Sequence, residues 1–155
     1  MNIINTSIIG LVFLVACGGD DAGGISSTIS PTQGGSLQLE GTETGITFPE
    51  GAVETEVEVS LSLGSIADFA PRENALNDVL VFSPELLLTA SASMTFEIGD
   101  SFDSSTQRAH IEQFVDGVWL RPEISSLEVG SGGVAFGSLQ SLSPTAIVVT
   151  DIPLD

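Results

Sequence analysis

The sequence predicts an all-β fold, a two-sheet antiparallel β-sandwich that occupies residues 36–155. From Gly35 onward, apolar residues recur at every second position, which is the period of a strand with one buried face. No segment keeps apolar residues at three-four spacing long enough to predict a helix. The short alternating segments are separated by Gly, Pro, Asn and Asp, and this spacing is typical of a sandwich.

The clearest predicted strand spans residues 57–63 and follows a Phe-Pro-Glu-Gly turn. Its odd positions are aliphatic and predict the core face, whereas acids and serines occupy the even positions: Val57, Val59, Leu61 and Leu63 against Glu56, Glu58, Ser60 and Ser62. In the turn, Pro49 suits the second position of a type I turn that starts at Phe48, and Gly51 suits the fourth. The stretch is therefore predicted to lead one strand into the next.

Further strands are predicted by the same alternation. Residues 94–98 place Met94, Phe96 and Ile98 on one face, and Val134 with Phe136 repeats the pattern. A hairpin is predicted over residues 111–120, because an Asp-Gly pair at 116–117 suits a type I′ turn. We expect Trp119 on its returning strand to anchor the core.

Residues 65–77 show no alternation and contain a proline. They predict a loop that contains one short helical turn.

The excess of acidic over basic residues limits the kinds of partner that the protein can bind. The chain has 21 acidic residues against three arginines, for a formal net charge of −18. Such a field repels nucleic acid and anionic lipid head groups and attracts cations or a basic partner, although scattered acids also serve solubility alone. The single cysteine, Cys17, excludes an internal disulfide.

The N-terminal segment predicts a signal peptide and a tether. Residues 8–16 form an apolar run that is too short to span a bilayer as a helix but suits a signal peptide. Residues 18–35 are rich in Gly and Ser and nearly devoid of large apolar side chains, which predicts a flexible tether. The predicted organisation is therefore a signal peptide over 1–16, Cys17 with its tether over 17–35, and one domain over 36–155.

Leu14-Val15-Ala16-Cys17 resembles the lipobox of bacterial lipoproteins. The resemblance implies that the Cys17 thiol carries diacylglycerol, that the chain is cut before Cys17, and that the new amino group is acylated. Two or three alkyl chains make membrane attachment effectively permanent. The n-region, residues 1–7, departs from the pattern because it lacks Lys and Arg.

Three stretches resemble, in order, the ZU-five domain, the β-sandwich module of ankyrins, Unc-five-type netrin receptors and the zonula occludens scaffold. They are residues 46–52 (ITFPEGA), residues 82–85 (FSPE) with the strand 94–98, and residues 116–119 (DGVW) with 141–147 (SLSPTAI). The second stretch lacks the family's Lys-Pro and has Ser91-Ala92-Ser93 there. The all-β pattern, the tether and the missing catalytic groups predict a non-enzymatic interaction or structural module.

Some ZU-five relatives cut their own chain at a His-Phe-Ser sequence, where Ser attacks the preceding carbonyl and His helps as base. Here the positions read Ser141-Leu142-Ser143, so the nucleophile is kept and the base is not. Autoprocessing before Ser143 is one alternative function; the simpler reading of Ser143-Pro144 is a turn.

Other chemistry has few candidate residues. His110 is the only histidine, and we expect it in a solvated polar ladder with Arg108 and Glu112 on one strand face. Without a Gly-x-Ser-x-Gly elbow the sequence does not predict a hydrolase, and one His with one lipidated Cys does not suffice for zinc. Asp100 and Asp103, in the loop 99–105, are weak candidate ligands for calcium, so a calcium-stabilised adhesion domain is a second alternative.

Taken together, the sequence predicts a non-enzymatic protein that is attached to a bacterial membrane through lipid on Cys17, without another cofactor. The expected location is the cell envelope, at the outer membrane or cell surface, and the expected partner is an envelope protein or a glycan.

Overall fold

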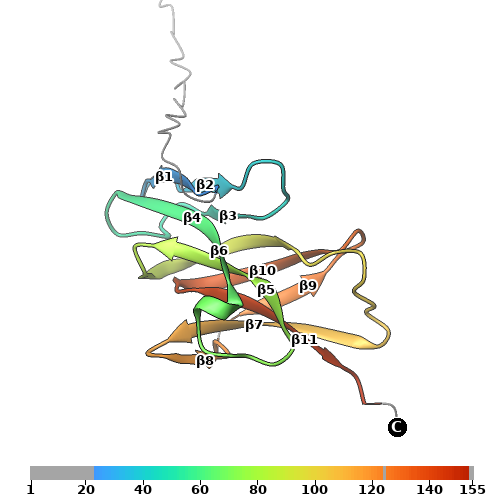
Figure 1. The fold of residues 1–155 in the computed structure, drawn as a ribbon. Coiled ribbons are helices and arrows are strands. Elements are labelled where there is room, and N and C mark those ends of the chain that lie inside the picture. The colour runs from blue at the N-terminus through green and yellow to red at the C-terminus, as the bar shows by residue number, and fades with distance from the viewer. Residues whose placement is uncertain (1–22, 124, 154–155) are drawn as a thin grey trace, which may run out of the picture.

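A computed structural model describes residues 23–123 and 125–153, and it shows two antiparallel β-sheets that face one another (Figure 1). One sheet has six strands in the order β1-β4-β5-β11-β7-β8, and the other has five in the order β2-β3-β6-β10-β9. The predicted fold class, an all-β sandwich of two antiparallel sheets, is confirmed. No helix in these described residues is long and apolar enough to span a bilayer.

The strand bounds are as follows. The six-stranded sheet contains β1 (Ile25–Ile29), β4 (Val57–Ser65), β5 (Ala75–Ser83), β11 (Thr145–Asp151), β7 (Gln107–Val115) and β8 (Val118–Leu120). The five-stranded sheet contains β2 (Gly35–Gln38), β3 (Gly45–Phe48), β6 (Leu86–Glu97), β10 (Val134–Leu142) and β9 (Ser126–Val129).

The hydrophobic core lies between the sheets and takes side chains from both. The largest fully buried ones include Phe48, Leu61, Met94, Leu139 and Ile147. All four edge strands have five residues or fewer, which limits the unpaired backbone that could recruit another chain.

The strongest local predictions are confirmed. In β4, Val59 and Leu61 are fully buried, and Val57 and Leu63 are partly buried against the core. The hairpin β7–β8 turns at Asp116 and Gly117, which have φ of 51° and 85°, as a type I′ turn requires.

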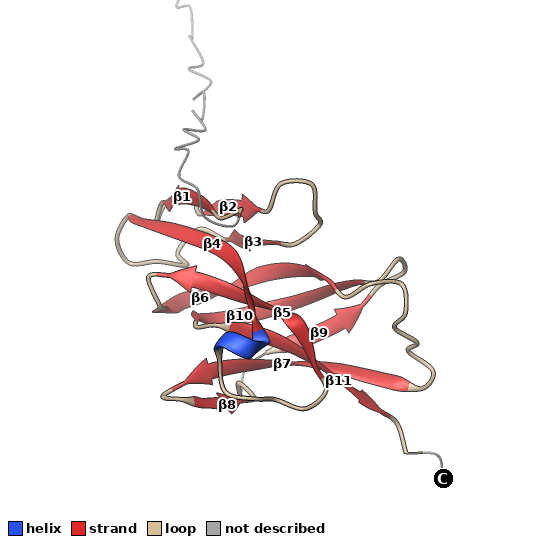
Figure 2. Cartoon of the chain, in the orientation of Figure 1, coloured by secondary structure: helices blue, strands red, loops and turns tan. Residues whose placement is uncertain are grey.

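The loop before β5 contains the expected helical turn. A 3-10 helix, η1 (Ile66–Asp68), is the only helical element in the part of the chain that the structure describes (Figure 2).

The predicted inward face of β10 is wrong. Val134 and Phe136 do share a face, but Phe136 pairs with Thr95 on the solvent side of the sheet and is 51% exposed. Ala135 points into the core instead and is fully buried. Period-two alternation shows which side chains share a face, and it does not show which of the two faces is buried.

The predicted tether over residues 17–35 is too long, because β1 lies inside it. Ile25 to Ile29 pair with Leu61 to Val57 of β4, and Ile29 is fully buried in the core. Ile25, Ser27 and Ile29 alternate with exposed residues, a short pattern that the Gly/Ser-rich composition obscured. The described fold therefore begins ten residues before the predicted domain boundary at Gly35.

The chain crosses from the six-stranded to the five-stranded sheet at Gly34. Its φ is +68°, and a Cβ atom there would lie 2.0 Å from the carbonyl oxygen of Phe48, so only glycine fits this corner.

The turn after β3 lies one residue later than predicted. Ala52 N donates to Pro49 O, which makes Gly51 the third residue of the turn, with φ of +79°. A positive φ at this position is the feature of a type II turn, and it explains the glycine.

Candidate functional site

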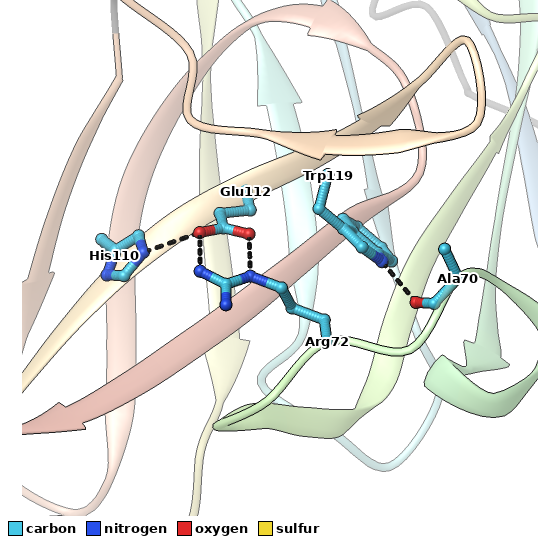
Figure 3. A network of polar contacts seen from close by, with 5 residues as sticks. All are labelled: Ala70, Arg72, His110, Glu112 and Trp119. Carbon is cyan, nitrogen blue, oxygen red and sulfur yellow. Dashed lines mark hydrogen bonds and ion pairs between the residues drawn. The ribbon is translucent and has the colours of Figure 1, made fainter.

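The outer face of the six-stranded sheet carries the only ionisable side chain that is buried among the described residues, Glu112 of β7. Arg72 donates from Nε and Nη2 to the two carboxylate oxygens, at 2.5 Å each, and His110 Nε2 lies 3.0 Å from Oε1 (Figure 3). Two side chains from β7 and one from the loop before β5 thus form one network. We call Arg72, His110 and Glu112 the clamp.

The clamp favours the ionised form of Glu112. The hydrogen bonds from the Arg72 guanidinium lower the pKa of Glu112, burial opposes this by raising it, and the hydrogen bond with His110 lowers it further. The same bidentate pair raises the pKa of Arg72. Glu112 is therefore charged and paired at neutral pH.

The loop that supplies Arg72, residues 66–74, is fastened at both ends. At its start, Ser65 caps η1: its hydroxyl accepts from Ala67 N, and the Asp68 carboxylate accepts from Ser65 N. At its end, the carbonyl of Asn74 accepts from Val149 N of β11 at 2.8 Å. The loop is thereby held over the sheet.

An aromatic cluster continues the contact between loop and sheet. Phe69 lies at 5.3 Å from Phe114 and 5.7 Å from Trp119 between ring centroids, and Phe114 lies at 5.1 Å from Trp119. The rings meet edge to face or tilted, the arrangements that aromatic pairs prefer. Trp119 Nε1 also donates to the carbonyl of Ala70 at 2.8 Å (Figure 3).

The sequence predicted that Trp119 anchors the core between the sheets, and this prediction is wrong. In the β7–β8 register it lies opposite Phe114, and Phe114 shares its face with Glu112, not with the core residue Ile111. Trp119 anchors the loop 66–74 to the outer face of the sheet instead.

The expected solvated ladder on β7 is wrong for Glu112. Arg108, His110 and Glu112 do share a face, but only Arg108 is exposed, where its Nη1 donates to the carbonyls of Ser104 and Gln107. The partner of Glu112 is Arg72, which is 40 positions away in a segment without periodicity. No local pattern could have revealed the pair.

The structure does not bring His110 near Ser143. His110 lies opposite Val148 in the β7–β11 register, and Ser143 precedes Val148 by five residues, roughly 16 Å along a strand. Ser143 lies in the β10–β11 turn, where its carbonyl accepts from Thr145 Oγ1 at 2.8 Å, and Leu142 before it is fully buried. His110 thus belongs to the clamp and is not placed to act as a base for Ser143.

Asp100 and Asp103 lie in the loop between β6 and β7. Asp103 Oδ1 accepts from Ser105 Oγ at 2.6 Å and from Ser105 N at 2.9 Å, and these bonds lower the pKa of Asp103. No group of three or more His, Cys, Asp or Glu side chains in the described residues is placed to hold a metal ion. The Asp103 carboxylate therefore stabilises the turn that contains Ser105 by accepting these two hydrogen bonds.

This loop packs against residues 130–133. Ile98 N and Gly99 N both donate to the carbonyl of Gly133, and a hollow of about 290 Å³ remains beside Asp100 and Phe102.

A second hollow, of about 420 Å³, lies on the outer face of the five-stranded sheet. Its lining includes Ser36, Thr47, Ser93 and Thr95. No sequence motif marked these residues, because they lie on three strands, β2, β3 and β6, that only the fold brings together.

Cys17, the predicted lipidation residue, lies outside the described residues. Comparison of the sequence with protein-family models and with curated proteins gave no match.

Proposed function

We propose that this protein is a non-enzymatic, lipid-anchored component of the bacterial cell envelope, in which Cys17 carries the lipid and the sandwich is an interaction or structural module of ZU-five-like type. The observation that carries the proposal is the stretch Leu14-Val15-Ala16-Cys17, which combines an apolar signal core with small residues before a lone cysteine. The alkyl chains on Cys17 supply the membrane affinity.

The position of β1 supports a close attachment. Residues 18–24 separate Cys17 from Ile25, and seven residues reach at most about 25 Å when extended. In Figure 1, β1 and β2 lie at one end of the sandwich and β8 at the other. The proposed anchor thus holds the β1–β2 end nearest to the membrane, and the β7–β8 hairpin projects away from it.

The clamp supports a non-enzymatic role. The histidine that a nucleophilic mechanism would need is hydrogen-bonded to Glu112, which Arg72 also holds. These groups fasten a loop to a sheet, and the geometry gives each of them a structural partner.

The anchor is tested by labelling cells with palmitate and comparing wild type with Cys17→Ala and, as a control that leaves the cysteine in place, Ser7→Ala. We expect label on wild type and Ser7→Ala and none on Cys17→Ala. Label that persists on Cys17→Ala would refute the anchor.

The non-enzymatic role is tested separately, with model esters and peptides as substrates of the purified protein. We expect no turnover above buffer. Turnover that is present in wild type and lost in His110→Ala would overturn this part of the proposal.

A further inference from the structure

Five hydroxyl side chains form a continuous row across the outer face of the five-stranded sheet. Directly paired positions of β2, β3, β6, β10 and β9 carry them in this order: Ser36, Thr47, Ser93, Ser138 and Ser126. Paired positions of neighbouring strands lie about 4.8 Å apart and point to the same side of a sheet. We call these five residues the hydroxyl row.

Most of the row is open to a ligand. Ser36, Thr47, Ser93 and Ser126 are exposed, and the Ser126 and Ser138 hydroxyls contact one another at 3.1 Å. The other three hydroxyls have no hydrogen-bond partner within the described chain. Each can therefore both donate to and accept from a bound molecule.

The adjacent row shapes a groove and supplies an aromatic ring. It runs through Gln38, Gly45, Thr95, Phe136 and Glu128 on the same five strands. Gln38, Gly45 and Thr95 of this row line the 420 Å³ hollow. Two strands away from Gly45 in this row, Phe136 is 51% exposed.

The chemistry of this face selects among ligands. Sugar hydroxyls are donors and acceptors like the serine and threonine hydroxyls, and the C–H face of a sugar ring packs on an aromatic ring. Nucleic acid and other polyanions are disfavoured, because the chain carries a net charge of −18 and Glu43 lines the hollow. The hydroxyl row itself is uncharged, which matches an uncharged partner.

We propose that this face binds a neutral oligosaccharide that lies along the hydroxyl row, across the strands, with one ring against Phe136. The inference rests on the proposed envelope function, since it names the glycan as the partner of the anchored module. Ser36, Thr47 and Ser93 exchange hydrogen bonds with successive hydroxyls, and Gln38 lines the groove beside them.

The test is a titration of the ¹⁵N-labelled full chain, purified in detergent, with cellotetraose and with chitotetraose, followed by amide chemical shifts. We expect saturable shifts on β2, β3, β6 and β10 with a Kd of roughly 0.1–1 mM, and weaker binding of the monosaccharides by about tenfold, because a single ring engages only part of the row.

Single substitutions test which side chains contact the oligosaccharide. Thr47→Val keeps the shape of the side chain and removes the hydroxyl, so we expect binding to weaken about fivefold; Phe136→Ala should weaken it about tenfold. The matched controls are Thr28→Val, an exposed threonine on β1 of the other sheet, and Phe102→Ala in the β6–β7 loop, both of which should bind as wild type. A retained amide spectrum shows that each variant is folded.

Absence of shifts with both tetrasaccharides, or equal binding by Thr47→Val, Phe136→Ala and wild type, would overturn the proposal. Tighter binding of tetralysine to the same amides would also overturn it, in favour of a cationic partner. The titration does not depend on lipid. Failure here, with palmitate label on wild type and none on Cys17→Ala, rejects the glycan alone. Saturable shifts with label that persists on Cys17→Ala, or with no label on wild type, reject the anchor alone.

Discussion

The outer faces of the two sheets differ in how they meet solvent. On the six-stranded sheet, Val79, Ala146 and Val148 are fully buried although they do not belong to the core between the sheets. Ala146 and Val148 lie opposite Glu112 and His110 in the register, so they share the face that the loop 66–74 covers. This face is a second, smaller core with an ion pair at its margin.

The outer face of the five-stranded sheet has no such cover among the described residues. Four of the five residues in its hydroxyl row and Phe136 are exposed, and the side chains are mostly small and polar. One outer face thus holds a loop, and the other is open to solvent. Exposed side chains without internal partners, such as that of Thr47, can be varied at little cost to folding, and they are available to a ligand.

The largest expected difference between the faces concerns their aromatic side chains. Trp119→Ala removes a ring that contacts two others and a hydrogen bond to Ala70, and we expect it to lower the free energy of unfolding by about 3 kcal/mol. Phe136→Ala should change it by less than about 0.5 kcal/mol. Urea unfolding followed by circular dichroism measures both, and equal losses would abolish the distinction between the faces.

Exchanging valine and threonine, which have nearly the same shape, compares the two faces directly. Val148→Thr places a hydroxyl in the covered face, where burial without a partner costs about 1–3 kcal/mol. Thr47→Val removes a hydroxyl from the open face and should leave the free energy of unfolding within about 0.5 kcal/mol of wild type. A large loss for Thr47→Val in the same unfolding measurement would show that the open face has an internal partner.

The clamp predicts a smaller effect. Glu112→Gln keeps the shape of the side chain but removes the charge that pairs with Arg72, and we expect a loss of about 1–2 kcal/mol, since Arg72 is one-third exposed. Glu128→Gln, an exposed acid on the open face, is the control and should be neutral within about 0.5 kcal/mol. A double variant with Arg72→Gln should lose little more than either single variant, and additive losses would contradict a coupled pair.

The pH dependence of the clamp is the finest test. The pKa of Glu112 is lowered in the folded protein, so its contribution is complete above the ordinary glutamate value of 4.5 and is lost as the pH falls through the folded pKa. The difference in unfolding free energy between wild type and Glu112→Gln should therefore shrink below pH 4.5. Asp103, whose pKa is also lowered, is common to both proteins and cancels in the difference. A pH-independent difference would mean that the pairing of Glu112 is not ionic.

Local pattern predicted much of the fold. The strand β4, the inward face of β6 around Met94, the Asp116-Gly117 turn and the helical turn at η1 all follow from periodicity and turn chemistry. By contrast, β1 was missed because its alternation spans only five residues within a Gly/Ser-rich segment, and its stability comes from pairing with β4.

The clamp and the hydroxyl row could not be predicted, and the reason is the same for both. Arg72 meets Glu112 across 40 positions, and the five hydroxyls lie on strands that adjoin only once the five-stranded sheet has formed. The sequence by itself determined an all-β chain, because period two and turn residues act between near neighbours. Only the tertiary structure decided that Phe136 faces solvent and that Trp119 packs beneath a loop, because alternation pairs side chains by face while the second sheet and the loop choose which face is covered.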